Sequence, residues 1–235
     1  MKATEFEFRH RSILNLIQFW IAFQAYSFDH DDIVWRYIHW DTPIGAFRAR
    51  LLFSFAAFLL LIAALIRTGA TAYLSAKVVH DPALHSEALM AEGPYRYVRN
   101  PLYCGTFLMS LGLGFLASVT GFIILVGLAA IRIMRLIGRE EFELTRKQGS
   151  AYSEYIERVP RFLPSLLPRV PSRGAVPRWG QALVGEATMW GLFVMMTAFT
   201  ITLQDRVAYV LTGVTMLWWI GRTIYVRIQS RTANS

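Results

Sequence analysis

The stretch of sequence that decides the fold spans residues 92–105 and reads EGPYRYVRNPLYCG. It is too rich in Arg, Tyr and Asn, and too broken by proline, to form a membrane helix. The apolar segment 102–117 continues directly from it. Backbone that is not helical exists at membrane depth only where protein or a water-filled cavity covers it. We therefore expect a loop at the mouth of a membrane helix, and this loop is the first candidate for a functional site.

The composition is that of an integral membrane protein. Of the 235 residues, 54% are hydrophobic and 17% are charged, a balance typical of membrane rather than soluble proteins. Six apolar segments are candidates for membrane helices, at about 13–28, 51–74, 102–117, 119–137, 182–203 and 207–226. We expect the first to be retained rather than cleaved as a signal peptide, because Glu5 and Glu7 precede it. The sequence thus predicts an all-α, polytopic membrane helix bundle of about six transmembrane helices, with a cytoplasmic site loop and short helices on its C-terminal side.

The net charge of +8 follows from membrane topology rather than from a nucleic-acid partner. With the N-terminus in the cytoplasm, the outer loops hold only four arginines, which are Arg36, Arg48, Arg50 and Arg206. The other basic residues lie in cytoplasmic segments or near their membrane ends, which is the positive-inside pattern. We therefore expect both termini and the site loop on the cytoplasmic side. A basic face there suits anionic lipid headgroups, and we expect no nucleic acid to bind.

The single cysteine, Cys104, excludes an internal disulfide and a cysteine-based zinc cluster. We expect it to be buried as a small apolar residue. No group of His and Cys residues has the spacing of metal ligands, so the sequence predicts no metal site.

The segment 102–137 predicts a hairpin of two helices. Its 36 residues contain no charge before Arg132. A single helix of that length would span about 54 Å, well beyond a hydrocarbon core of about 30 Å. A turn near residues 118–121 solves this problem and returns the chain to the same membrane face. Residues 92–103 and 135–141 are then expected to lie side by side.

Three arginines at helical spacing, Arg132, Arg135 and Arg139, fall on one face of the helix that leaves the membrane. Two interpretations remain open: positive-inside charge at a helix end, or a site for an anionic substrate or headgroup. Further along, residues 160–177 contain five prolines and no periodicity, which predicts a cytoplasmic linker. Glu186 lies near the entry of the fifth apolar segment, where we expect it to snorkel to the membrane interface.

The two polar clusters that flank the hairpin contain three kinds of side chain. Tyrosines offer π faces for a flat base or a cation. Glutamates accept hydrogen bonds from a ribose diol or an ammonium group, and arginines donate to a carboxylate or phosphate. These residues are Tyr95, Tyr97, Tyr103, Glu140, Glu141, Arg96 and Arg99. Together they suit an amphoteric cofactor that carries a nucleoside, although no glycine-rich dinucleotide motif is present.

Three separated motifs make the pattern specific. They are residues 93–105, then REEFEL at 139–144 after the hairpin, then GxxYxxYxxxVPR at 149–161. In this order they resemble the isoprenylcysteine carboxyl methyltransferase and phospholipid methyltransferase superfamily of integral membrane enzymes. The resemblance covers about residues 80–164. It implies a membrane methyltransferase core over residues 1–164, followed by a proline-rich cytoplasmic linker (165–181) and a C-terminal two-helix membrane hairpin with a tail (182–235).

The resemblance also implies S-adenosylmethionine as cofactor and assigns residues to it. The cofactor-binding set that it implies is His80, Leu89, Met90, Tyr95, Arg99, Asn100, Pro101, Leu102, Tyr103 and Glu140. Its arginine for the methyl acceptor has Arg135 or Arg139 as the nearest counterpart, and Glu141 is the candidate base for an amine acceptor. One position departs from the family, because Asn100 stands where the family has histidine. Asparagine retains hydrogen bonding but cannot serve as an imidazole.

The function predicted in this way is methyl transfer in the membrane to a lipid-like or prenylated acceptor with a carboxylate or amine headgroup. Two other interpretations stay open. Membrane reductases of the sterol-reductase type are similar in the same Arg-x-Pro-x-Tyr region but use NADPH. A non-catalytic lipid-binding relative is the other, and the substitution at Asn100 favours it. The identity of the acceptor and the oligomeric state do not follow from the sequence.

Overall fold

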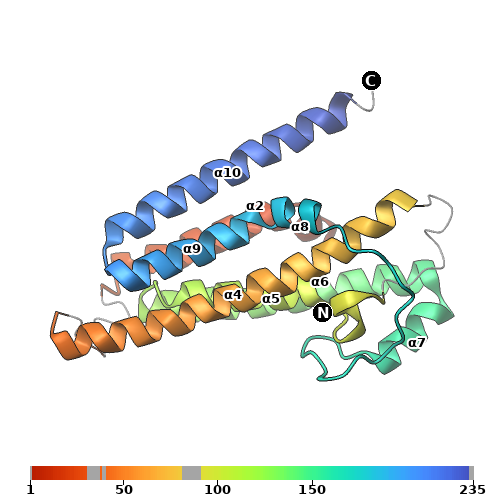
Figure 1. Ribbon diagram of the computed structural model, residues 1–235, viewed down its shortest axis with the longest axis horizontal. Helices are drawn as coiled ribbons and strands as arrows, with labels where there is room; N and C mark the ends of the chain where they lie inside the picture. The colour runs from red at the N-terminus through yellow and green to blue at the C-terminus, as the bar shows by residue number, and fades with distance from the viewer. Residues whose placement is uncertain (1, 31–37, 39–40, 81–90, 233–235) are drawn as a thin grey trace.

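The computed structural model describes residues 2–30, 38, 41–80 and 91–232, and for these residues the regular structure is entirely helical. The predicted all-α class is therefore confirmed for this part of the chain. The long helices lie roughly along one direction, and the last of them, α10 (Asp205–Thr232), tilts away from the others toward the C-terminus (Figure 1).

The N-terminal residues form two helices. Helix α1 (Glu5–Arg9) begins at Thr4, whose side chain and that of Glu7 exchange hydrogen bonds with each other's backbone N–H in a capping box. Helix α2 (Arg11–Gln24) follows, with a short 3-10 turn η1 (Ala25–Ser27) at its end. Helix α2 packs against α6 (Val119–Gln148), and the amide of Gln18 donates to the carbonyl of Leu125 across this interface at 3.0 Å.

The longest helix, α4 (Pro43–His80), forms the spine of the fold. Its 38 residues are about 57 Å long, so it extends beyond a hydrocarbon core of about 30 Å. It packs against α5 (Pro101–Gly114) on one side and α9 (Ala187–Thr202) on another. Small residues permit the first contact: a Cβ added at Gly112 would lie 3.0 Å from the carbonyl oxygen of Ala56. The rings of Phe53 and Phe199 close the second contact edge to face.

The predicted hairpin is confirmed. Helix α5 ends at Gly114, and α6 begins after Ser118, whose hydroxyl accepts a hydrogen bond from the N–H of Gly121. Helix α6 then continues without a break to Gln148. Gly149, with a φ of 59°, ends it and leads into α7 (Ser150–Arg158). Helix α7 and the loop before α5 lie at the same end of the molecule (Figure 1).

Length and composition identify some of the helices of the described residues as candidate membrane spans. Three helical segments of the described residues qualify, Pro43–Leu74, Val119–Gln148 and Asp205–Tyr225. A fourth qualifies if α8 (Trp179–Gly185) and α9, which meet at an angle of 61°, form one broken span. Helices α2 and α5 have 14 residues each, about 21 Å, which is too short to cross the hydrocarbon core alone. All six apolar segments are helical, whereas six complete spans stay a prediction.

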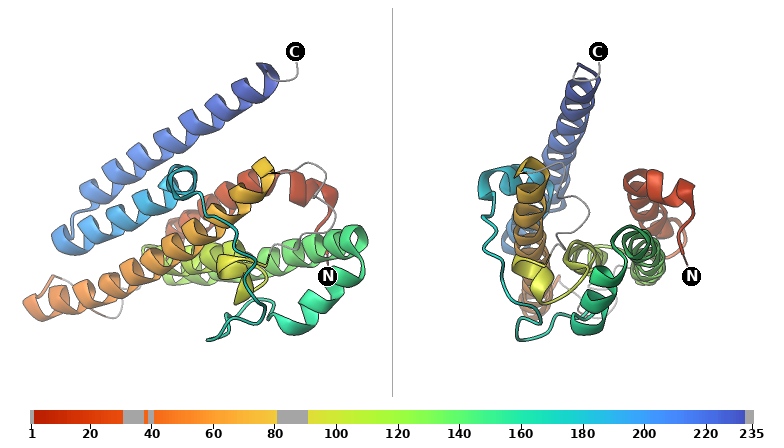
Figure 2. Two further views of the ribbon diagram at one scale, coloured as in Figure 1. Left: turned by 45° about the vertical axis from the view of Figure 1, so that its right-hand side comes forward. Right: turned by 90° about the vertical axis from the view of Figure 1, so that its right-hand side faces the viewer.

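The proline-rich segment between α7 and α8 is packed rather than free, although it has no regular structure. It runs along the outside of the helices in both views of Figure 2. The N–H of Arg99 donates to the carbonyl of Pro160, and the N–H of Ser165 donates to the carbonyl of Tyr97. Residues 160–178 therefore form a strap over the site loop. The carboxylate of Glu92 anchors it by accepting hydrogen bonds from the Ser172 hydroxyl, at 2.9 Å, and from the Arg173 N–H.

Candidate active site

A cavity of about 880 Å³ opens between α1, α2, α4, α5, α6, α7 and the loop before α5. This volume lies within the range of pockets that hold small ligands and cofactors. Of the ten residues predicted to bind the cofactor, seven line it: Tyr95, Arg99, Asn100, Pro101, Leu102, Tyr103 and Glu140. The structure thus brings the two predicted polar clusters together around one cavity.

Local sequence fixes the shape of the site loop. Gly93 opens the 3-10 turn η3 (Gly93–Arg96) with a φ of 53°, and a Cβ at this position would lie 2.2 Å from the ring of Tyr73. Only glycine fits there. The buried Tyr95 follows, and its carbonyl accepts a hydrogen bond of 2.7 Å from the Tyr155 hydroxyl. Pro101 then starts α5, where a missing N–H has no cost. Burial raises the pKa of the Tyr95 phenol, so this group stays a neutral hydrogen-bond donor.

Glu140 and Tyr103 join the two walls of the cavity. The Tyr103 hydroxyl donates to Glu140 Oε1 at 2.8 Å, from α5 to α6. The carboxylate is thereby held at a fixed place on the wall.

Glu141, the predicted base, lies elsewhere. It is 8% exposed and does not line the cavity. Its carboxylate accepts from Asn100 Nδ2 at 3.1 Å and from Arg161 Nη2 at 2.8 Å, and it pairs with Arg99 at 3.3 Å. The Glu140 side chain faces the cavity, whereas the Glu141 side chain faces the site loop and Arg161. Glu141 instead holds the back of the site loop, which corrects the predicted role. The Asn100 amide also donates to the carbonyl of Arg161 at 3.0 Å, so its N–H groups serve the same scaffold.

The two arginines predicted to bind the acceptor are neutralised by the N-terminus. Arg135 pairs with Glu7 at 2.7 Å and lines a separate shallow pocket rather than the main cavity. Arg139 lines the main cavity, but its guanidinium pairs with Glu5. The hydrogen bond from Arg135 lowers the pKa of the Glu7 carboxyl to about 2. Helix α1 thus covers this end of α6, and the anion-site interpretation does not hold for Arg135.

Arg132 is the arginine that the sequence did not single out among the three. It lines the cavity, donates to Gln18 Oε1 at 2.6 Å and donates to the carbonyl of Arg11 at 3.1 Å. Both partners are neutral, and within the described parts of the chain no carboxylate forms an ion pair with it. Arg132 therefore contributes to the cavity wall a positive charge that no carboxylate of the described residues pairs with directly.

Gln148 is a second residue that sequence reasoning missed. It lines the cavity beside Lys147 and Tyr152, and its Oε1 atom is buried without a hydrogen-bond partner among the residues that the structure describes. A buried acceptor without a donor is costly, which points to a donor supplied by a ligand. The sequence predicted that this part of the chain is helical, and the position of Gln148 near the end of that helix is the signal that could have indicated it.

Other residues that the sequence analysis singled out are not among those lining the cavity. His80 is the last residue of α4, and only its backbone is described, whereas Leu89 and Met90 fall outside the described residues. Arg96 and Tyr97, which looked suited to a cofactor, do not line the cavity. They hold the strap instead: Arg96 Nε donates to the carbonyl of Val170 at 2.9 Å.

Two further expectations concern Glu186 and Cys104. Glu186 does not snorkel: it is 7% exposed and forms an ion pair with Arg67 at 2.7 Å, because the break between α8 and α9 points it at α4. Arg67 itself lines the cavity. Cys104 is buried as predicted and donates to the carbonyl of Phe162. Among the residues that the structure describes, no three His, Cys, Asp or Glu side chains are placed to hold a metal ion.

Comparison with known proteins gives one match. The sequence model of the phospholipid methyltransferase family matches residues 51–149. This range includes most of α4, the site loop and the whole α5–α6 hairpin, and it ends at the glycine before α7. No curated protein and no solved structure matches the chain.

Proposed function

We propose that this chain is an S-adenosylmethionine-dependent membrane methyltransferase, on the premise that its residues 51–149 match the sequence model of the phospholipid methyltransferase family. Its acceptor in this proposal is a lipid-like or prenylated molecule. The observation that carries the proposal is the convergence of Tyr95, Tyr103 and Glu140, from two clusters separated by a hairpin, on one cavity of about 880 Å³.

The residues present fit the cofactor. Its adenosyl and methionyl parts carry amino and hydroxyl donors. The cavity offers two acceptors, the Glu140 carboxylate and the buried Gln148 Oε1, which has no hydrogen-bond partner among the described residues. Tyr95 and Tyr152 supply aromatic surface on the same wall. We assign the cofactor to this end of the cavity, with Glu140 and Gln148 binding its donors.

When bound, the sulfonium group supplies an already activated methyl group. The protein's own residues then need to align the acceptor and exclude water. Helix α1 serves the second purpose, because Glu5 and Phe8 line the cavity and the ion pair between Glu5 and Arg139 holds α1 against α6.

We assign the acceptor headgroup to the deeper end of the cavity, near Arg132. Its guanidinium, which forms no ion pair with a carboxylate of the described residues, suits a phosphate or carboxylate, since charge-assisted hydrogen bonds are strong in a partly buried site. Ala129 and Ile133 line the same end and provide apolar surface for a lipid chain. A carboxylate nucleophile needs only positioning. For an amine nucleophile Glu140 replaces Glu141 as the candidate base, because Glu140 is the one that faces the cavity.

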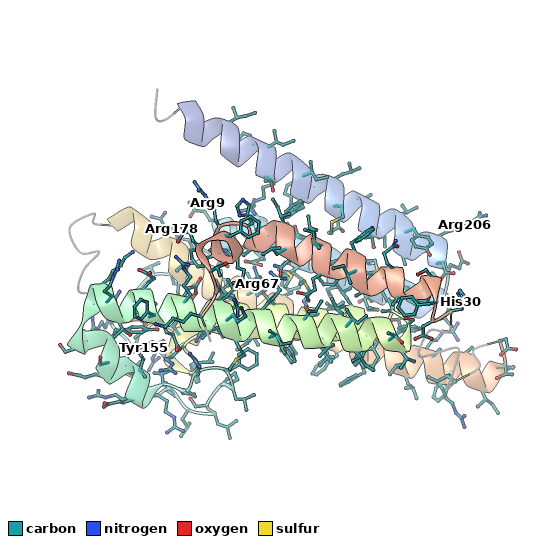
Figure 3. The ribbon with its side chains drawn as sticks, turned by 180° about the vertical axis from the view of Figure 1, so that it is seen from behind. Arg9, His30, Arg67, Tyr155, Arg178 and Arg206 are labelled. Atoms are coloured by element: carbon teal, nitrogen blue, oxygen red, sulfur yellow. The ribbon has the colours of Figure 1, made fainter. Side chains whose placement is uncertain are left out.

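We also propose that the site end faces the cytoplasm. Figure 3 shows Arg9, Arg178 and Tyr155 toward one end of the helices and His30 and Arg206 at the other. The N-terminal segment, the basic end of α6 and the site therefore share one end, which matches the positive-inside pattern.

A binding and labelling experiment tests the proposal. Calorimetry on the purified protein should show binding of S-adenosylhomocysteine, and a total membrane extract should incorporate radiolabelled methyl groups into a lipid fraction. Binding of NADPH without S-adenosylhomocysteine would instead support the reductase. Binding of S-adenosylhomocysteine without any labelled acceptor would support the non-catalytic relative.

A further inference from the structure

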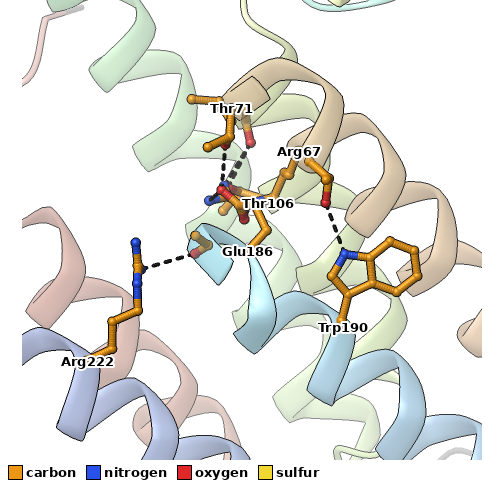
Figure 4. A network of polar contacts seen from close by, with 9 residues as sticks. Arg67, Thr71, Thr106, Glu186, Trp190 and Arg222 are labelled. Atoms are coloured by element: carbon orange, nitrogen blue, oxygen red, sulfur yellow. Dashed lines mark hydrogen bonds and ion pairs between the residues drawn. The ribbon is translucent and has the colours of Figure 1, made fainter. Parts of the chain in front are cut away.

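A partly buried ion pair links the C-terminal helices to the cavity wall (Figure 4). Glu186 sits at the 61° break between α8 and α9, outside the range that the family model matches. Its two oxygens accept from Arg67 of α4, at 2.7 Å from Nε and 3.1 Å from Nη2. The hydroxyl of Thr71, one turn further along α4, donates to the same carboxylate at 2.8 Å.

The other side of the Arg67 guanidinium reaches the cofactor wall. Its Nη1 atom donates to the Leu102 carbonyl at 3.2 Å and to the Thr106 hydroxyl oxygen at 2.8 Å. Both acceptors belong to the first turns of α5, the helix that presents Pro101, Leu102 and Tyr103 to the cavity. Arg67 therefore fixes the start of α5, and Glu186 fixes Arg67.

The geometry of the break serves this contact. Helix α8 ends at Gly185, where a Cβ would lie 3.5 Å from the Thr71 side chain, so the chain approaches α4 closely. Arg222 of α10 donates to the carbonyl of Gly185 at 3.1 Å and satisfies the end of α8. An unbroken helix would carry residue 186 past α4 on another face. The bend is thus the feature that aims the carboxylate at Arg67.

Stability alone does not account for the pair. Taking two charges out of water costs about as much as their attraction returns, and apolar residues of similar volume often replace such pairs without loss. What apolar residues cannot replace is the direction of the two hydrogen bonds from Nη1 to α5.

We propose that Glu186 is a positioning residue of the methyl-transfer site, acting through Arg67 to hold the first turn of α5 in the form that binds the cofactor. In this proposal helices α8 to α10 help to shape the site, in addition to holding the protein in the membrane. The inference rests on the proposed function, since it assigns the cofactor to the wall that Arg67 holds.

Three variants test this. Glu186→Gln keeps the volume but removes the charge that fixes Arg67. Trp190→Phe is the matched control, because it removes a hydrogen bond of 3.0 Å from α9 to Thr68 of α4 that does not reach the cavity. Arg67→Met/Glu186→Met replaces both charges with apolar volume, so it keeps packing while removing the bonds to α5.

Two measurements apply to each folded variant. The first is the Kd for S-adenosylhomocysteine, which we expect to rise about tenfold or more in Glu186→Gln and in the double variant, and to stay within about twofold of wild type in Trp190→Phe. The second is hydrogen–deuterium exchange without ligand. Peptides covering residues 101–106 should exchange faster than in wild type in Glu186→Gln and in the double variant, but not in Trp190→Phe.

The outcomes are distinct. Wild-type affinity in the folded double variant, or an equal loss in Trp190→Phe, would overturn the inference. If the wild-type protein does not bind S-adenosylhomocysteine at all, the proposed function fails instead. In that case the exchange measurement still decides whether Glu186 positions α5, because it needs no ligand.

Discussion

The Tyr103 hydroxyl donates a hydrogen bond of 2.8 Å to Glu140 Oε1 across the two arms of the α5–α6 hairpin. The two residues lie 37 positions apart in the sequence. This bond joins the site loop to the helix that leaves the membrane. It makes the hairpin itself the frame of the cavity.

Removing the hydroxyl should weaken ligand binding without unfolding the protein. Tyr103→Phe retains the ring but leaves the Glu140 carboxylate without its donor. Because a hydrogen bond to a charged group contributes about 1.5–3 kcal/mol, we expect the Kd for S-adenosylhomocysteine to rise about tenfold or more by calorimetry. The control is Tyr26→Phe, which removes the 2.8 Å bond to the Leu116 carbonyl, away from the cavity. Equal losses in both variants would argue against a special role for Tyr103.

Gln148 offers a test in which stability and binding change in different ways. Gln148→Leu removes a buried acceptor that has no partner in the described structure, so the free energy of unfolding should stay level or increase. Affinity for S-adenosylhomocysteine should fall, because a donor of the ligand loses its acceptor. Thermal unfolding and calorimetry on the same preparation check both effects. Unchanged affinity in a stable Gln148→Leu protein would remove Gln148 from the site.

Arg132 and Arg135 should behave differently although they lie on one helix. Arg132→Gln removes this positive charge from the cavity, and we expect the KM for an anionic acceptor to rise about tenfold to a hundredfold with cofactor affinity unchanged. Arg135→Gln removes a charge that already forms an ion pair with Glu7 and lies outside the main cavity. The KM for the acceptor should therefore stay unchanged in this variant. Steady-state kinetics with the acceptor found by labelling measures both. An effect of Arg135→Gln as large as that of Arg132→Gln would reject this assignment.

Acid should release the N-terminal helix. The pKa of Glu7 is lowered from 4.5 to about 2 in the folded protein, so its ionised form is stabilised by the hydrogen bond from Arg135. The resulting stabilisation is fully present above pH 4.5 and is lost as the pH falls toward 2. Between these values, limited proteolysis at the N-terminus should accelerate in wild type more than in Glu7→Gln. Identical pH profiles for the two proteins would show that the pair does not hold α1.

Much of the fold follows from local pattern. The absence of charge over residues 102–131 and the length of segment 102–137 predicted the hairpin. The apolar segments 13–28 and 102–117 include the turns that follow α2 and α5, so each of these two helices is shorter than its segment. Hydropathy does not distinguish a complete helix from a shorter helix followed by an apolar turn.

Sequence reasoning found site residues that lie in contiguous motifs, and it missed contacts between residues that are distant in the sequence. The family resemblance assigned ten residues to the cofactor, and seven of them line one cavity. The pairs Glu7–Arg135 and Glu186–Arg67 join residues 128 and 119 positions apart, and no periodicity in the sequence indicates which carboxylate meets which guanidinium. Adjacency alone did not tell Glu140 from Glu141, since other adjacent pairs on α6, such as Lys147 and Gln148, both line the cavity.

The most direct test of the central claim is the affinity of wild type and Glu140→Ala for S-adenosylhomocysteine, with NADPH as the competing ligand. We predict that wild type binds S-adenosylhomocysteine and not NADPH, and that Glu140→Ala, still folded, loses this binding. Unchanged affinity in Glu140→Ala, or binding of NADPH alone by wild type, would contradict the assignment of this cavity to S-adenosylmethionine.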